Sequence, residues 1–230
     1  MKRRMFWFRG IVLIFASVLG LQAIWLVTAD LIHPRLPYFP QDKAGEEKVW
    51  AARSAALSAA SIGWLRGDLW TDAAVALSRG LTNVTAKEDD PQMTPQRNQA
   101  RVVAQRAARF SPHDSRVWLL VAAQDSRFDW RRDDDVNRLK MSYFTGPNEL
   151  DLAPMRIQIA IGSSAISDVD LQSLVGQEIR SIVLRHQELK PSLLSAYRDG
   201  SPEGREFLEA TIGDVDKNFL ATLRASDSRQ

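Results

Sequence analysis

The pattern of apolar and polar positions predicts an all-α protein. Apolar residues recur every three or four positions along most of the chain, which is the period of an amphipathic helix, and strand-like alternation is almost absent. Helices are expected over about 44–66, 70–81 and 132–144. A polar segment with two prolines, residues 85–96, predicts a loop between two of them.

A proline interrupts the helical period in the middle of the chain. Small apolar residues precede it on one predicted helix face: Ala100, Val103, Ala104, Ala107 and Phe110. Bulkier residues follow it on the next face: Val117, Trp118, Val121 and Ala122. Pro112 therefore ends one helix, and Asp114 or Ser115 is placed to cap the next. The alanines allow close approach of a neighbouring helix, and Trp118 fills the remaining space.

The same arrangement recurs further along the chain. Pro112 and Pro147 lie 35 residues apart, and each follows a predicted helix and precedes an acidic or amide residue. This period resembles that of the tetratricopeptide repeat (TPR) family. The matching residues are Ala100, Ala104, Ala107 and Pro112 in one half-repeat, Trp118, Val121 and Ala122 in the next, and Leu139 with Pro147. The family's aromatic position in the second helix is occupied by Ala104 and by Leu139, and Asp125 replaces its usual tyrosine.

The resemblance implies stacked antiparallel helical hairpins, a TPR-like α-solenoid, over residues 44–165. It also implies a groove in which such proteins bind peptides or proteins. The groove-facing positions of the clearest first helix are Arg116, Leu119, Ala123, Ser126 and Arg127. The two arginines could clamp carboxylates of a partner, although solvent-exposed surface charges explain them equally well.

The C-terminal part, residues 166–225, is predicted to be a further helical region, followed by a frayed tail at 226–230. Its first helix has three candidate caps: Ser167, Asp168 and Asp170. Its last helix is expected to begin at Ser201, with Pro202 in the first turn, and to continue to about Arg224 on one apolar face.

The first thirty residues differ in character from the rest. A basic flank at residues 1–9 precedes an apolar run at 10–29. Twenty helical residues span about 30 Å, the thickness of the hydrocarbon core of a bilayer. An uncleaved single-pass anchor is the leading interpretation, with the flank in the cytoplasm. A cleaved signal peptide is the alternative, because Val27 and Ala29 have the small-residue spacing of a cleavage site, and a buried soluble helix is a third. Three prolines in residues 30–43 predict an extended linker.

Composition is that of an ordinary globular protein, with 45% apolar and 25% charged residues in a chain of 230. There is no cysteine, so neither disulfides nor thiolate metal sites can form. The pI is near 9.0, but the chain after the N-terminal flank is not basic. Four of the 30 basic residues lie in that flank, and the remaining 26 are outnumbered by 28 acidic residues. No cluster of Lys and Arg is visible, and nucleic-acid binding is not expected.

Motifs for catalysis are also missing from the sequence. The three histidines, His33, His113 and His186, lack the spacing of a helical metal site. We therefore expect no enzyme activity, no metal and no cofactor. A glycan- or peptide-acting enzyme would need carboxylates that converge across a cleft. The C-terminal part offers five acids for this alternative: Glu178, Glu188, Glu203, Glu206 and Asp214.

Together these features predict a scaffold or adaptor at the bacterial inner membrane, with its C-terminal domain in the periplasm. Its expected partners are envelope proteins, and its oligomeric state is not predicted. Short anchored repeat proteins resemble accessory components of exopolysaccharide or capsule synthesis and export, an analogy of architecture only. An assembly factor for another envelope complex, such as a division or secretion apparatus, is the alternative.

Overall fold

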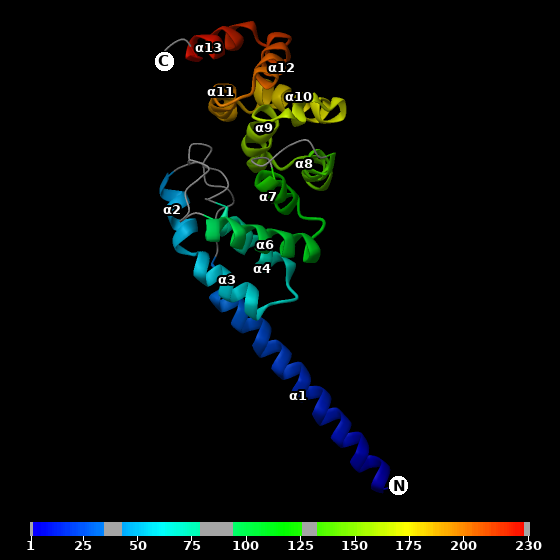
Figure 1. Cartoon of the computed structure of the whole chain (residues 1–230). Coiled ribbons are helices and arrows are strands. Elements are labelled where there is room, and N and C mark those ends of the chain that lie inside the picture. The colour runs from blue at the N-terminus through cyan, green and yellow to red at the C-terminus, as the bar shows by residue number, and fades with distance from the viewer. Residues whose placement is uncertain (1, 35–42, 79–93, 126–132, 228–230) are drawn as a thin grey trace.

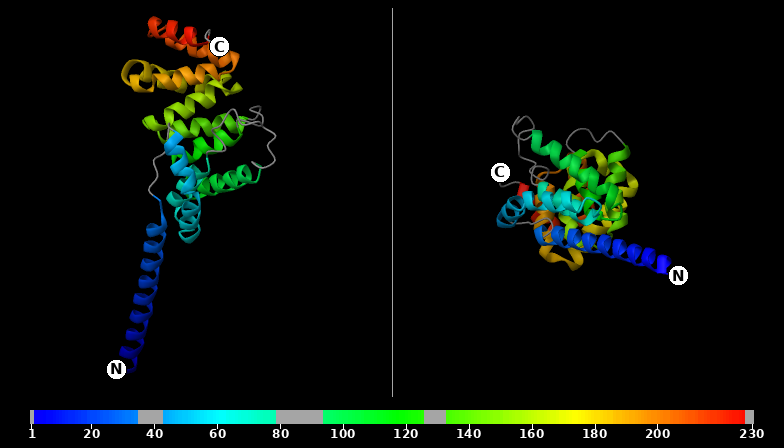
Figure 2. Two further views of the ribbon diagram at one scale, coloured as in Figure 1. Left: turned by 90° about the vertical axis from the view of Figure 1, so that its left-hand side faces the viewer. Right: turned by 90° about the horizontal axis from the view of Figure 1, so that it is seen from below.

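The computed structural model describes residues 2–34, 43–78, 94–125 and 133–227. These residues form α-helices and short 3-10 helices and contain no strand, which confirms the predicted all-α class. Figure 1 shows α1 projecting from one end of a stack of helices that ends with α13. Figure 2, from two further directions, shows the helices after α6 in successive layers.

The helices up to residue 110 are α1 (Lys2–Ile32), α2 (Lys43–Ala51), α3 (Arg53–Ile62), α4 (Gly67–Leu77) and α6 (Thr94–Phe110). Those after it are α7 (Ser115–Asp125), α8 (Asp133–Thr145), α9 (Ala153–Ile161), α10 (Val169–Arg185), α11 (Lys190–Arg198), α12 (Pro202–Gly213) and α13 (Lys217–Asp227). Three short 3-10 helices connect them: η1 (Leu150–Leu152), η2 (Ser164–Ser167) and η3 (Gln187–Leu189).

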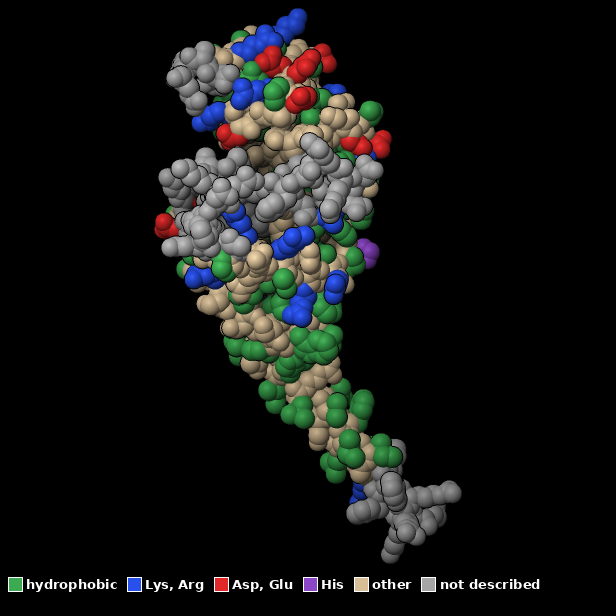
Figure 3. Space-filling model, viewed as in Figure 1, with side chains coloured by type: hydrophobic (Ala, Val, Ile, Leu, Met, Phe, Trp, Pro, Cys, Tyr) green, Lys and Arg blue, Asp and Glu red, His purple; other side chains and the backbone are tan. Residues whose placement is uncertain are grey.

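Helix α1 is longer than the predicted apolar run of 10–29. Its segment Arg9–Ile32 is long and apolar enough to cross a membrane, and it is the one such helix among the described residues. Apolar side chains cover its free length (Figure 3). The far end of α1 is different, because Ala29 is completely buried where α1 packs on α3. The predicted linker therefore begins only after this docked end, and residues 35–42 lie outside the described part.

The helix predicted over 44–66 is two helices, α2 and α3, joined at Ala52. The Arg53 guanidinium donates to the Trp50 carbonyl oxygen at 2.8 Å and stacks on the Trp50 ring at 4.2 Å. A continuous helix would use that carbonyl for the amide four residues later. Beyond this joint, α4 packs against both α3 and α6 through faces rich in alanine.

The predicted repeat region, residues 44–165, contains a helix that the periodicity did not predict. Helix α9 begins with Pro154 in its first turn and buries most of its surface. Its buried residues are Ala153, Met155, Arg156, Ile157, Ala160 and Ile161. At nine residues, α9 is shorter than the window of about 11–18 residues over which a helical period can be recognised.

The last predicted helix is also two helices, α12 and α13. The side chain of Asp216 accepts from the backbone amides of Asn218 and Phe219 at 3.1 and 2.9 Å, which starts a new helix. The predicted start at Ser201 is confirmed, because its hydroxyl accepts from the Gly204 amide at 3.0 Å. Gly204 also lies against α9, where an added Cβ would be 2.0 Å from the Ile161 carbonyl oxygen.

Candidate functional site

Two equivalent turns, 35 residues apart in the sequence, form the candidate site. In the first, the Ser111 amide donates to the Ala107 carbonyl at 2.8 Å, and the Asp114 amide donates to the Ser111 carbonyl at 3.1 Å. In the second, the Gly146 amide donates to the Ser142 carbonyl at 3.2 Å, and that of Glu149 to the Gly146 carbonyl at 3.4 Å. The predicted spacing of Pro112 and Pro147 thus corresponds to the same backbone turn made twice.

The two turns are in direct contact. The Ser115 hydroxyl donates to Glu149 Oε2 at 2.5 Å. Glycine at position 146 makes room for this contact, since an added Cβ would lie 2.6 Å from both Cβ and Oγ of Ser115. Trp118 braces the first turn from the other side, with its indole N–H donating to the Pro112 carbonyl at 2.7 Å.

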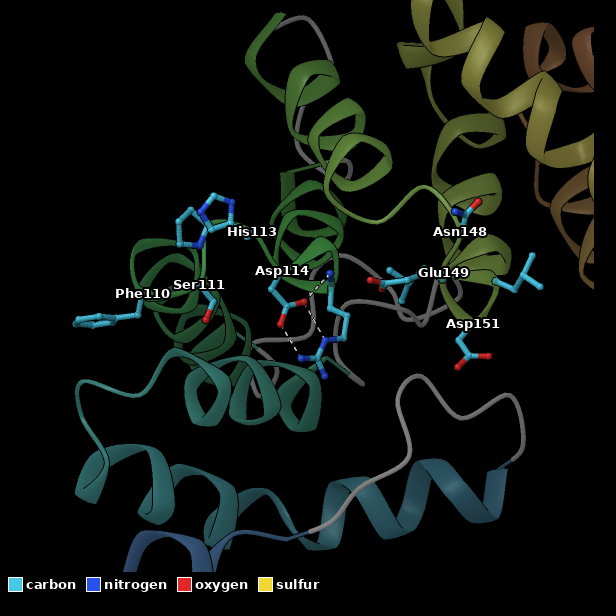
Figure 4. Close-up of a pocket in the computed structure, with 11 residues that line it drawn as sticks. Phe110, Ser111, His113, Asp114, Asn148, Glu149 and Asp151 are labelled. Carbon is cyan, nitrogen blue, oxygen red and sulfur yellow. Dashed lines mark hydrogen bonds and ion pairs between the residues drawn. The ribbon is translucent and has the colours of Figure 1, made fainter. Parts of the chain in front are cut away.

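An open cavity of about 810 Å³ lies between the turns. Its lining comes from the end of α6, the start of α7 and the segment before α9 (Figure 4). The residues are Phe110, Ser111, Pro112, His113, Asp114, Arg116, Asn148, Glu149, Leu150, Asp151 and Leu152. Sequence reasoning had identified both turns, but it had not predicted a cavity between them.

Arg116, one of the predicted groove residues, is held by two carboxylates. Its Nε and Nη2 donate to Asp114 at 2.9 and 2.6 Å, as the dashed lines in Figure 4 show. Its Nη1 reaches Asp72 on α4 at 3.3 Å. Asp114 also caps α7, as predicted, by accepting from the Arg116 amide at 3.0 Å. The guanidinium is therefore a structural part of the cavity wall.

Asp72 connects this wall to the end of α1. Its Oδ2 lies 2.7 Å from His33 Nε2, while its Oδ1 contacts Arg116. Burial raises the pKa of the Asp72 carboxyl, and the neighbouring Arg116 and His33 oppose that change. His33 was predicted to lie in a linker, but it directly follows the last turn of α1, with its amide bonded to the Ala29 carbonyl at 3.0 Å.

The predicted groove residues separate into three groups. Arg116 lines the cavity, whereas Leu119 and Ala123 are buried in the core with 0% and 3% of their surface exposed. Ser126 and Arg127 lie outside the described residues. Partner binding by this set stays a prediction, and among its described members only Arg116 borders the cavity.

The acids considered for an enzyme do not line this cavity. Glu178 is buried, where it accepts from the Tyr143 hydroxyl at 2.7 Å and lies 3.5 Å from Arg156. Burial raises the pKa of Glu178 above its usual value. The other four acids lie on exposed parts of η3 and α12 or at the end of α12. Within the described residues, no group of three or more His, Asp and Glu side chains is arranged to hold a metal ion.

These observations define an all-α protein with packed helix pairs and one apolar N-terminal helix, an arrangement compatible with a helical repeat. Comparison of the chain with protein-family models, with curated proteins and with solved structures gives no match. The likeness to TPR proteins therefore rests on the chain's own residues and on the two equivalent turns.

Proposed function

We propose that the chain is a membrane-anchored, TPR-like adaptor that binds a protein segment in the cavity between its two equivalent turns. The observation that carries the proposal is the path from α1 to the cavity wall through His33, Asp72 and Arg116. An anchor and a candidate binding surface are thereby joined by direct polar contacts.

The burial of Ala29 supports an anchor that is retained. Cleavage after Ala29 would remove α1 and with it the contact between α1 and α3, exposing the alanine and glycine surfaces that meet there. The new terminus would begin at Asp30, whose carboxylate is paired with Arg66. In this proposal the basic flank lies in the cytoplasm and the helical domain in the periplasm.

The charges around the cavity favour a basic partner segment. Arg116 is neutralised by Asp114 and Asp72, so it is poorly placed to clamp a partner's carboxylates. Glu149 and Asp151 are exposed on the opposite wall. Their carboxylates suit Lys or Arg side chains or backbone amides of an extended segment. The partner class remains an envelope protein, and exopolysaccharide or capsule export is one setting that the architecture suits.

Site-specific photo-cross-linking of the full chain in cells tests this function. A photoreactive residue at the exposed Asn148 in the cavity wall is compared with one at Leu184, which is 62% exposed on α10 and lies outside the cavity lining. We expect a defined adduct at position 148, absent at 184 and lost in the double variant Glu149→Gln/Asp151→Asn. The side-chain amide oxygen that Glu149→Gln introduces can still accept from Ser115, so this variant removes charge and keeps the turn.

Two results would contradict the proposal. Adducts of the same masses at positions 148 and 184 would mean that the cavity has no selectivity. Adducts at 148 that persist in the charge-neutralised variant would exclude recognition by these carboxylates.

A further inference from the structure

The depth of α1 in a bilayer can be estimated from its sequence. Arg9 is the last basic residue before the apolar run, and Asp30 is the first acidic residue after it. The twenty residues between them span about 30 Å as a helix, which matches the hydrocarbon core. If α1 spans the membrane as proposed, Ala29 lies at the outer boundary of the hydrocarbon.

The turn between α3 and α4 lies at this same level. An added Cβ on Gly63 would be 3.4 Å from the Cβ of Ala29, so the backbone of the turn contacts α1 closely. Arg66, at the end of the turn, pairs with Asp30 of α1 and with Asp68. Hydrogen bonds to these two carboxylates raise the pKa of Arg66, with those to Asp68 contributing most, so the guanidinium stays charged. Figure 1 shows α3 running down beside α1 to the base of the globular part.

The two residues between these contacts are large, apolar and exposed. Trp64 and Leu65 have 57% and 56% of their surface accessible. The backbone of the turn is fixed at Trp64, because the Trp70 indole N–H donates to the Trp64 carbonyl at 3.0 Å. In Figure 3 the hydrophobic side chains of α1 continue onto the base of the globular part, with Lys and Arg side chains directly above.

We propose that the Trp64–Leu65 turn is a second membrane contact, inserted at the boundary between headgroups and acyl chains. Tryptophan is enriched at that depth because its ring is apolar and its N–H is polar. The charged pair of Arg66 and Asp30 would lie on the aqueous side of the same boundary. This inference rests on the proposed anchoring by α1 and goes beyond it, since anchoring by α1 does not by itself require the Trp64 and Leu65 side chains to enter the lipid.

The natural absence of cysteine gives a direct test. Single-cysteine variants of the full chain, Val18→Cys, Leu65→Cys and Leu184→Cys, are spin-labelled and placed in liposomes of zwitterionic and anionic phospholipid. Depth is read from the ratio of collision rates with oxygen, which partitions into lipid, and with a water-soluble nickel chelate. All three native residues are more than half exposed, with 54%, 56% and 62% of their surface accessible, so each label should be tolerated.

We expect the ratio at position 65 to be several-fold higher than at 184 and lower than at 18. A label at Trp64→Cys should give the same depth as that at 65. A ratio at both positions equal to that at 184, with 18 deep in lipid, would overturn the second contact and leave the anchor intact. A water-accessible label at 18 would instead overturn the anchor and the proposed function with it. Circular dichroism of each labelled variant confirms that the compared chains are equally helical.

Discussion

The helices nearest α1 are held together by alanine, whereas those near the C-terminus are held by isoleucine and leucine. Buried alanines occur at Ala56, Ala59 and Ala60 in α3, Ala73, Ala74 and Ala76 in α4, and Ala104 and Ala107 in α6. Fully buried larger residues dominate the other part: Ile157, Ile161, Ile166, Leu171, Ile179 and Ile182. The first part therefore depends on close backbone approach, and the second on side-chain volume.

Side-chain caps divide the helices less sharply. Asp168 and Ser201 cap α10 and α12, whereas α3 and α4 in the first part and α9 and α11 in the second begin without a side-chain cap. The helices after α8 also contain a buried charge, since the Arg156 side chain in α9 is completely inaccessible to solvent. The part next to α1 thus depends on small residues, and the part beyond it on large apolar side chains and a buried charge. Four experiments, taken in order of the largest expected effect, test this difference.

Arg156→Ala should cause the largest loss of stability. The guanidinium joins α8 to α9 by donating to Ser142 Oγ and the Gly146 carbonyl oxygen at 3.0 Å each, and it faces the buried Glu178. Removing one partner of a buried ion pair typically costs about 3–5 kcal/mol. Chemical unfolding of the full chain in detergent, followed by circular dichroism, measures the change. The double variant Arg156→Met/Glu178→Met should recover much of the loss, and a loss below about 1 kcal/mol in the single variant would contradict this role.

Ile179→Ala should have the next largest effect. Ile179 is completely buried in α10, and removal of a large aliphatic side chain leaves a cavity that costs about 2–5 kcal/mol. Ala59→Gly, in the alanine-rich part, should cost only about 1 kcal/mol, mainly through helix propensity. Equal losses in the two variants, measured by the same unfolding assay, would show that the two parts do not differ in this respect.

Ala104→Phe tests the alanine-rich part by adding side-chain volume instead of removing it. Position 104 is where the TPR resemblance expects an aromatic residue, yet Ala104 is completely buried in α6, which packs closely on α4. Overpacking of a well-filled site costs about 1–3 kcal/mol. Ala104→Ser is the size-matched control. An Ala104→Phe variant as stable as the natural chain would mean that space for an aromatic ring exists and that the repeat is closer to the family pattern.

Glu178→Gln should have the smallest effect, and that effect should depend on pH. Because burial raises the pKa of Glu178 above 4.5, its contribution to stability is complete below that value and declines as the pH rises through the raised pKa. The natural chain should therefore lose stability relative to Glu178→Gln as the pH rises above 4.5. Unfolding free energies of both chains, compared at a series of increasing pH values, measure the difference. A difference that grows in the opposite direction would show that Arg156 stabilises the ionised form more than burial disfavours it.

Local features of the sequence predicted much of the fold. Proline and capping residues act over a few positions, so the end of α6 at Pro112 and the start of α12 at Ser201 were predicted correctly. Helix α9 was missed because it is too short to show a clear helical period, and the end of α12 because Asp216 restarts the helix without breaking the apolar period.

The candidate site was less predictable, because its contacts join distant parts of the chain. His33 and Asp72 are 39 residues apart, and Asp72 and Arg116 are 44 apart. Nothing in a helical period relates such positions. The period of 35 residues did predict two equivalent turns, but only the fold shows that Ser115 and Glu149 bring them together.

The docking of α1 on α3 would restrict which partners can reach the cavity. A domain on a flexible tether samples a wide volume, and its effective concentration toward any one target is low. Here the helix that would cross the membrane continues into contacts at Ala29 and His33, so the cavity would be held at one height and one orientation above the lipid. Such an arrangement favours partners in the same membrane whose binding segments lie at that height. The length of α1 between the membrane and its contact with α3 would then determine which partners the cavity can bind.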